Sequence, residues 1–165
     1  MFKDFYFTED QNFKIFCDMD GVLTNWKKEW HKLSDLDFDE YGNKYGTKAK
    51  WKLIEDQGIE FWSMMEWMPD GHKLWDYLKP FNPTVLSSPS RSQLSRDGKI
   101  IWTSRELGDN VEVILEKDKH KYACPNCILI DDTQEKIDKF IFAGGMGILH
   151  TDTKSTIEQL KGLGL

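Results

Sequence analysis

The sequence contains few cysteines and no long apolar run. Its three cysteines, Cys17, Cys124 and Cys127, are an odd and low number for a disulfide scaffold, and they favour a reducing, cytoplasmic location. No apolar stretch approaches the roughly 20 residues that cross a bilayer, so no membrane partner is expected. Residues 1–12 are too charged for a secretory signal, and we expect them to form a surface extension.

The sequence also lacks an excess of basic charge. It carries 22 Lys and Arg against 28 Asp and Glu, which gives a net charge of -6 at pH 7. Proteins that coat DNA or RNA need a basic surface, so a nucleic-acid polymer is not the expected partner. A phosphorylated small molecule is compatible with the charge, because a divalent cation can offset local carboxylates. The sequence leaves the oligomeric state open, a homodimer included.

Short apolar strands alternate with helices through most of the chain. A first strand is expected at about 13–17, and the alternation resumes at residue 70. This pattern predicts an α/β fold with a parallel sheet flanked by helices. We predict one domain over residues 1–165, with strands near 83–88, 111–116, 126–132 and 146–151, and helices near 68–81, 96–108, 133–145 and 153–164.

An aromatic segment separates the first strand from the rest of the core. The core is expected over about 13–21 and 67–165, which makes residues 22–66 a small, mostly helical cap inserted after the first strand. Helical spacing is found at 25–33, 48–58 and 59–67. Residues 37–47 are predicted to form a loop, because they are rich in Gly, Asn and Asp.

Polar side chains follow three of the predicted strands. In parallel sheets, ligands bind at the carboxyl ends of the strands, so these side chains are expected to converge. Carboxylates crowded at one edge suit Mg²⁺, which takes oxygen ligands and commonly binds one or two carboxylates with a substrate phosphate. An Asp can also attack a phosphoryl group as a nucleophile. The residues concerned are Asp18, Asp20, Ser87, Ser88, Asp131 and Asp132.

Other interpretations of the Asp-Met-Asp-Gly segment are a plain turn and a calcium loop. Asp is favoured in turns, so a surface turn is the simplest alternative. An EF-hand fits less well, because its Gly stands sixth and further ligands follow, whereas Gly21 stands fourth here.

Four segments resemble the ordered motifs of the haloacid dehalogenase-like (HAD) phosphohydrolases. They are DMDGVLTNW (18–26), VLSSPS (85–90), KDKHKYA (117–123) and ILIDD (128–132). Within that superfamily, 61–75, 86–90 and 128–132 are most similar to segments of the 5'(3')-deoxyribonucleotidases. The resemblance covers nearly the whole chain after the first dozen residues. It implies a HAD-type Rossmann-like sheet with a small helical cap, and a Mg²⁺-dependent phosphatase that forms an aspartyl-phosphate.

The resemblance also implies roles for single residues. Asp18 would be the nucleophile and Asp20 the general acid/base, whose backbone carbonyl contributes to the metal site. Asp132 would be a further metal carboxylate, with Asp131 in support. The phosphate-binding residues would be Ser87, Ser88 and Lys121, with Lys119 as the alternative lysine, and with Arg91 and Lys99 as extra basic residues.

Aromatic side chains are the candidates for substrate contact. Trp26 stands where the nucleotidases place a ring that stacks on the base, and Trp51, Phe61 and Trp62 are candidates from the cap. The alternative is that these rings build the core of a small cap. The resemblance favours a deoxyribonucleoside monophosphate as substrate. Another phosphomonoester such as a sugar phosphate, a nucleic-acid 3'-phosphate end, and a catalytically silent binding domain are the alternatives.

The Cys-x-x-Cys segment is interpreted as two ordinary thiols. A structural zinc site needs two more ligands at suitable spacing, and none is evident. A redox pair is expected to open a helix after a strand, whereas Cys124 and Cys127 lead into a strand.

Overall fold

A parallel sheet is the centre of the computed structural model, which describes residues 12–165. The expected surface extension falls almost entirely within residues 1–11, outside this range. In the described part of the chain, five strands pair in the order β3-β2-β1-β4-β5. The strands are β1 (Lys14–Cys17), β2 (Thr84–Ser87), β3 (Val113–Leu115), β4 (Cys127–Asp131) and β5 (Met146–Leu149).

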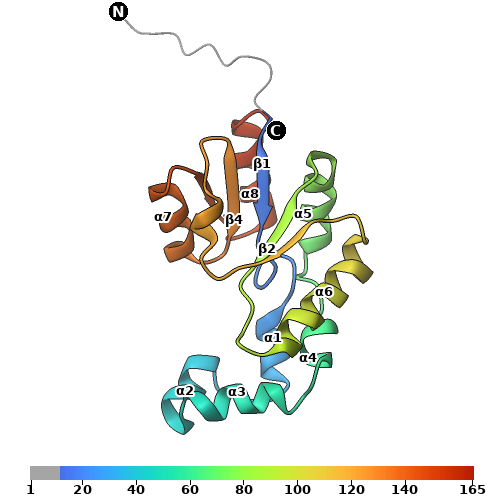
Figure 1. The fold of residues 1–165 in the computed structure, drawn as a ribbon, viewed down its shortest axis with the longest axis vertical. Helices are drawn as coiled ribbons and strands as arrows, with labels where there is room; N and C mark the ends of the chain where they lie inside the picture. The colour runs from blue at the N-terminus through green and yellow to red at the C-terminus, as the bar shows by residue number, and fades with distance from the viewer. Residues whose placement is uncertain (1–11) are drawn as a thin grey trace, which may run out of the picture.

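Helices connect and cover the strands, which confirms the α/β, Rossmann-like fold predicted from the sequence (Figure 1). Over residues 12–165, none of the helices combines the length and the apolar character needed to span a bilayer. The helices are α1 (Trp26–His31), α2 (Phe38–Tyr45), α3 (Thr47–Glu55), α4 (Glu60–Ser63), α5 (Gly71–Leu78), α6 (Gln93–Leu107), α7 (Gln134–Phe142) and α8 (Thr153–Gly162), with 3-10 turns η1 (Lys79–Phe81) and η2 (Lys119–Tyr122).

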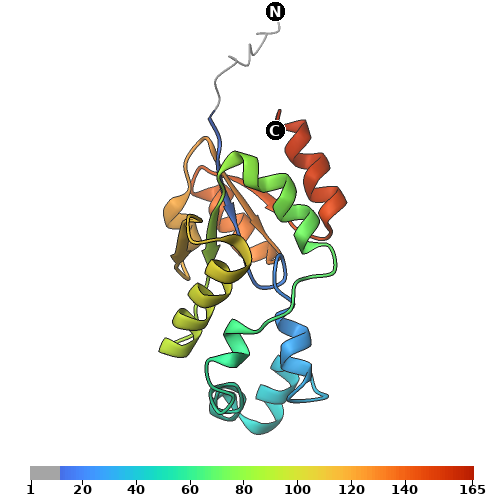
Figure 2. The same ribbon diagram turned by 90° about the vertical axis from the view of Figure 1, so that its right-hand side faces the viewer.

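The two faces of the sheet are buried against different helices. Successive side chains of a strand point to opposite faces, so Ile15 and Cys17 join one core while Phe16 joins the other. The larger core also contains buried side chains of α5, α6 and α8, and Figure 2 shows α5 and α8 side by side. The smaller core is closed by α7 and η2. Strands buried on both faces explain the nearly continuous apolar runs in the sequence.

The central position of β1 determines where the polar strand ends meet. β2 and β3 lie on one side of β1, and β4 and β5 lie on the other. The loops after β1 and β4 therefore leave neighbouring strands in different directions, which is the position where open α/β sheets bind ligands. The backbone N–H of Asp18 donates to the carbonyl of Ile130 at 2.8 Å, so the two carboxylate-bearing ends are directly adjacent.

Helices α1 to α4 lie between β1 and α5 along the chain and form a separate layer below the sheet in Figure 1. Aromatic contacts hold this layer together. The ring of Phe38 meets the rings of Trp26, Trp30 and Trp51 edge-on, each at 5.0 Å between centroids. Edge-to-face pairs of this kind stabilise a core beyond the area they bury.

The prediction of a loop over residues 37–47 is wrong, because α2 occupies most of this segment. Asp37 and Glu40 form a capping box at its first turn, a signal present in the sequence. Tyr41 packs edge-on against Trp30 at 5.4 Å. Capping and aromatic packing therefore outweigh the low helix propensity of Gly42 and Asn43.

A glycine permits the close contact between the cap and the core. Helix α6 packs against α4, and a Cβ built at Gly98 would lie 2.4 Å from the Cβ of Trp62 and 3.1 Å from the carbonyl oxygen of Ile59. These distances are too short for any side chain. Gly98 therefore sets the distance between α6 and α4.

The variant Gly98→Ala tests this contact. In an ordinary helix interior, Gly→Ala stabilises by about 1 kcal/mol. Here we expect a loss of about 1–3 kcal/mol in the free energy of unfolding, because the added methyl group overpacks the contact with Trp62. Urea unfolding followed by circular dichroism measures the sign. A stabilised variant would show that α4 can move away from α6 at little cost.

Candidate active site

A buried ion triad lies at the carboxyl end of the sheet. Asp18 follows β1, Asp131 ends β4, and Lys119 extends from η2. The Nζ of Lys119 lies 2.6 Å from Oδ1 of Asp18 and 2.6 Å from Oδ2 of Asp131. All three residues are buried, so each charge depends on the others for compensation.

The triad determines the protonation of its members. Burial acts to raise the pKa of Asp18, but Lys119, helped by Lys136 and Lys99, outweighs it and holds that pKa below its ordinary value. Burial acts to lower the pKa of Lys119, and the two carboxylates outweigh it and raise that pKa. Burial, followed by repulsion from Asp18, raises the pKa of Asp131. Asp18 is therefore an ionised carboxylate next to a permanent cation.

Lys119, the alternative lysine of the sequence analysis, takes the position expected for Lys121. The side chain of Lys121 is 54% exposed and pairs with Glu116 at 3.3 Å and Asp118 at 3.4 Å, away from the site. The prediction that the side chain of Lys121 lies at the phosphate site is therefore wrong. The two lysines stand two residues apart, and the 3-10 turn directs one inward and the other outward. Sequence spacing could not separate them.

A second buried lysine links two other strand ends. The Nζ of Lys99, from α6, lies 2.5 Å from Oδ2 of Asp20, 2.8 Å from Oγ of Ser87 and 3.2 Å from the carbonyl oxygen of Ser88. Thr24 donates to the other oxygen of Asp20 at 3.0 Å. Two partners thus orient the Asp20 carboxylate. Its side chain remains 28% exposed, so it can reach a molecule in the site.

Three carboxylates form a candidate cation site. Oxygens of Asp18, Asp131 and Asp132 all lie within 4.8 Å of one another. Partial desolvation, with repulsion from Asp18 and Asp131, raises the pKa of Asp132, the exposed member of the cluster, to about 6. Clustered carboxylate oxygens are the ligands that a hard divalent cation such as Mg²⁺ takes. The side chain of Asp20 is outside this cluster and pairs with Lys99, which leaves only its backbone carbonyl, as the sequence analysis expected, as a candidate for the metal site.

Gly21 allows Asp132 to approach the loop after β1. Its φ of +82° lies in the left-handed region that favours glycine, and a Cβ there would lie 2.1 Å from Oδ2 of Asp132. The Gly of the Asp-Met-Asp-Gly motif is therefore required twice, by the backbone conformation and by the neighbouring carboxylate.

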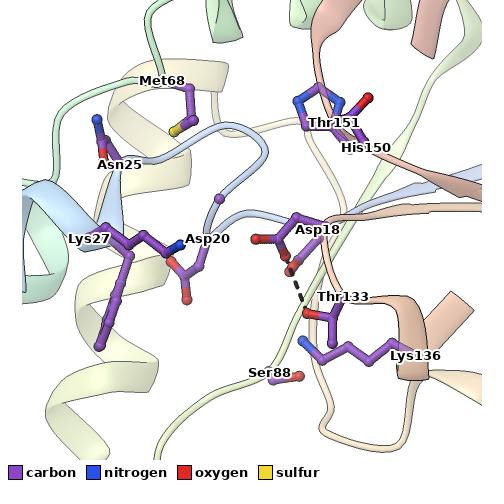
Figure 3. Close-up of a pocket in the computed structure, with 13 residues that line it drawn as sticks. Asp18, Asp20, Asn25, Lys27, Met68, Ser88, Thr133, Lys136, His150 and Thr151 are labelled. Atoms are coloured by element: carbon purple, nitrogen blue, oxygen red, sulfur yellow. Dashed lines mark hydrogen bonds between the residues drawn. The ribbon is translucent and has the colours of Figure 1, made fainter. Parts of the chain in front are cut away.

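A pocket of about 400 Å³ opens over these groups. Figure 3 shows Lys27 and Lys136 extending into it from opposite sides, with Asp18 and Asp20 between them. Ser88 also lines it, and the Ser88 Oγ is a buried oxygen without a hydrogen-bond partner among residues 12–165. Buried hydroxyls are normally paired, so this one indicates a place for a ligand oxygen.

Sequence reasoning missed several residues of the pocket wall. Asn25 and Lys27 flank the predicted Trp26, and Lys136 comes from the first turn of α7, with Nζ 3.8 Å from Asp131. His150 follows β5, and burial lowers its pKa. Their signal in the sequence is weak: Asn25 belongs to the first motif but was given no role, and Lys27, Lys136 and His150 lie within a few residues of a motif or strand end without belonging to a motif.

Of the four aromatic candidates, only Trp26 lines the pocket. Phe61 and Trp62 are buried in the larger core, and Trp51 packs against Phe38. These three rings pack against other side chains, which is the alternative given in the sequence analysis. The exposed Arg91 does not line the pocket either.

The interpretation of Cys124 and Cys127 as free thiols is also wrong. The two residues form a disulfide, and Cys17 is a free, buried cysteine.

Paired variants of the two lysines test the triad. Lys119→Met would leave Asp18 and Asp131 buried without a cation, so we expect a loss of about 3–5 kcal/mol in the free energy of unfolding. Lys121→Met changes only an exposed pair and should stay within about 0.5 kcal/mol of the parent protein. Urea unfolding of both variants gives the comparison. Equal losses in the two would contradict the geometry described above.

Comparisons with known proteins agree with the sheet and helix arrangement. No family model matches the chain, and no curated protein matches its sequence. A hydrolase from Streptococcus pneumoniae TIGR4 is 12% identical with a TM-score of 0.57, over 94% of this chain and 100% of that one. A HAD family hydrolase from Deinococcus radiodurans R1, with bound phosphate and sodium, is 12% identical with a TM-score of 0.54, over 92% and 89%. The L-2-haloacid dehalogenase from Xanthobacter autotrophicus is 9% identical with a TM-score of 0.51, over 90% and 82%. The chain therefore has the fold of the HAD hydrolases.

Proposed function

We propose that this protein is a Mg²⁺-dependent phosphatase of the HAD superfamily that hydrolyses a small phosphomonoester through an aspartyl-phosphate on Asp18. The observation that carries the proposal is the ionised Asp18, 2.6 Å from the buried Lys119 and within a three-carboxylate cluster. An ionised carboxylate next to fixed positive charge is suited to attack a phosphoryl group and to tolerate the charge that develops there.

Each side chain of the site has a role in this reaction. A free oxygen of Asp18 attacks phosphorus, and the bond from phosphorus to the ester oxygen breaks. Asp20, oriented by Lys99 and Thr24, donates a proton to the leaving oxygen. It then accepts a proton from the water that hydrolyses the aspartyl-phosphate. Lys119 and the unpaired hydroxyl of Ser88 contact the phosphoryl oxygens.

The three clustered carboxylates, Asp18, Asp131 and Asp132, would hold the cation. Mg²⁺, when bound, would offset the charge of the carboxylates and of the phosphoryl oxygens.

The proposed substrate is a deoxyribonucleoside monophosphate. A pocket of about 400 Å³ falls within the usual range for small-molecule sites. Trp26 offers a ring to a base, and such stacking contributes roughly 1–3 kcal/mol. Lys27, next to it, is directed into the same space (Figure 3) and can donate to a base carbonyl. A sugar phosphate, or a nucleic-acid 3'-phosphate end, would use the same catalytic groups without these two contacts.

Thermal melting with and without Mg²⁺ tests the cation site. The pKa of Asp132 is raised to about 6 from an ordinary 3.8, so ionisation of Asp132 destabilises the metal-free folded state as the pH rises through 6. Asp132→Asn should therefore raise the metal-free Tm at pH 7.5 and shrink the rise in Tm that Mg²⁺ causes. Asp138→Asn, an exposed position on α7, is the control and should keep the parent response. A full Mg²⁺ response in Asp132→Asn would contradict the site.

Phosphate release across a substrate panel tests the reaction. The panel contains 5'- and 3'-monophosphates of deoxy- and ribonucleosides, several sugar phosphates and a 3'-phosphorylated oligonucleotide, each with Mg²⁺. We expect preference for deoxynucleoside monophosphates, a loss of roughly four orders of magnitude or more in Asp18→Asn, and no turnover with EDTA.

Trp26→Ala, measured in the same assay, tests the substrate class separately from the reaction mechanism. Loss of stacking should raise KM for nucleotides by roughly 5- to 150-fold and leave sugar phosphates unaffected. Turnover of sugar phosphates only, or of the oligonucleotide only, would support the mechanism and contradict the proposal that a nucleotide is the substrate. No turnover at all would favour a binding domain.

A further inference from the structure

The Cys124–Cys127 disulfide lies between two members of the buried triad and has no role in the proposed reaction. It spans the loop from η2 to β4. Lys119 stands five residues before Cys124, and Asp131 stands four residues after Cys127. The disulfide therefore lies within the segment of chain that joins Lys119 to Asp131, one of its two carboxylate partners.

Hydrogen bonds connect this loop to three elements that carry site residues. The N–H of Ala123 donates to the carbonyl of His120 in η2 at 3.1 Å. The N–H of Cys127, the first residue of β4, donates to the carbonyl of Cys124 at 2.9 Å. The N–H of Lys14, at the start of β1, donates to the carbonyl of Asn126 at 3.0 Å. A change in the loop thus reaches η2, β4 and β1 directly.

The two sulfurs differ in access. Cys127 is 4% exposed and belongs to the smaller core with Phe16 and Phe140. Cys124 is only partly buried, and the next two residues, Pro125 and Asn126, are exposed. An incoming thiolate therefore reaches the sulfur of Cys124 first, and the sulfur of Cys127 is the leaving group.

A purely stabilising role fits the disulfide poorly. The entropy that a cross-link removes from the unfolded chain grows with the length of the closed loop, and this loop joins cysteines only three residues apart. The position of the disulfide next to η2 points instead to control of the neighbouring Lys119.

We propose that Cys124–Cys127 is a thiol–disulfide exchange site that controls the reaction by holding η2, and with it Lys119, in place. The proposal rests on the function proposed above, because the controlled activity is that of the phosphatase. The partner is a dithiol reductant, small or protein-borne.

A dithiol reduces the disulfide in two steps. One thiolate of the reductant attacks Sγ of Cys124, the S–S bond breaks, and Sγ of Cys127 leaves with the electron pair and takes a proton. The second thiol of the reductant then attacks its own sulfur in the mixed disulfide, and Cys124 leaves and is protonated. Two electrons and two protons pass to the protein, and the reductant becomes a disulfide.

Reduction should displace the lysine that two carboxylates require. In the oxidised form, Lys119 keeps 2.6 Å contacts to both Asp18 and Asp131. Without the cross-link, η2 can shift relative to β4. Misplacement of a catalytic group by about 1 Å costs up to about a hundredfold in rate, and we expect reduction to lower kcat/KM by roughly tenfold.

The first experiment counts thiols in the full-length protein, purified without reductant and unfolded before labelling. One reactive thiol, Cys17, is expected before treatment with dithiothreitol, and all three cysteines should react after it. Three reactive thiols in protein purified and handled in air would overturn the proposal.

The second experiment compares activity in the two states. Reduction by dithiothreitol should lower kcat/KM on the best substrate by roughly tenfold, and oxidised glutathione should restore it. The double variant C124S/C127S should have the low activity of the reduced protein and should not respond to either reagent. The single variant Cys124→Ser, at the more exposed sulfur, replaces it if the double variant does not fold. Unchanged activity after complete reduction would overturn the proposal.

Hydrogen exchange tests the thiol–disulfide proposal independently of the proposed phosphatase function. Amides of residues 118–123 should lose protection on reduction, while those of α5, whose buried side chains belong to the larger core, should keep theirs. This readout needs no substrate. If the panel shows no turnover, the phosphatase proposal fails, and equal protection of residues 118–123 in the two states would overturn the coupling independently.

Discussion

The ion triad of Asp18, Lys119 and Asp131 is the constraint on which the rest of the site depends. Three buried charges persist only if their distances are held closely, since each carboxylate would otherwise be an uncompensated charge in the core. The register between β1 and β4 brings the two carboxylates together, and η2 supplies the lysine. The triad also keeps Asp18 ionised, so the interaction that stabilises the site also prepares the carboxylate that we propose as the nucleophile.

The contact between α4 and α6 is the second constraint on the site. Gly98 lets α6 approach α4, and that approach places Trp62 below Lys99, whose Nζ lies 5.6 Å from the ring centre. Lys99 then reaches Asp20 and Ser87. The aromatic residues of the cap thus act mainly as packing that positions a lysine. Of the aromatic candidates, Trp26 alone lines the pocket, so the proposed stacking contact falls to α1.

Much of the fold and part of the site could be predicted from the sequence. Alternating strands and helices indicated the parallel sheet, and polar residues at strand ends indicated where a site would form. Where prediction failed, a local pattern allowed two outcomes. Lys119 and Lys121 lie in the same lysine-rich segment, the sequence favoured Lys121, and the 3-10 turn directs Lys119 into the site instead. Residues 37–47 read as a loop by composition, but capping and aromatic contacts make most of them a helix.

By itself, the sequence determined the α/β architecture and the carboxylates at the ends of β1 and β4, because hydrophobic periodicity and strand-end chemistry are local properties. The tertiary structure alone decided which lysine enters the triad and that Lys27 and Lys136 face one pocket. These outcomes depend on distances between residues far apart in the chain or on the direction of a single turn. Strand order and helix packing set those distances, and no local pattern contains them.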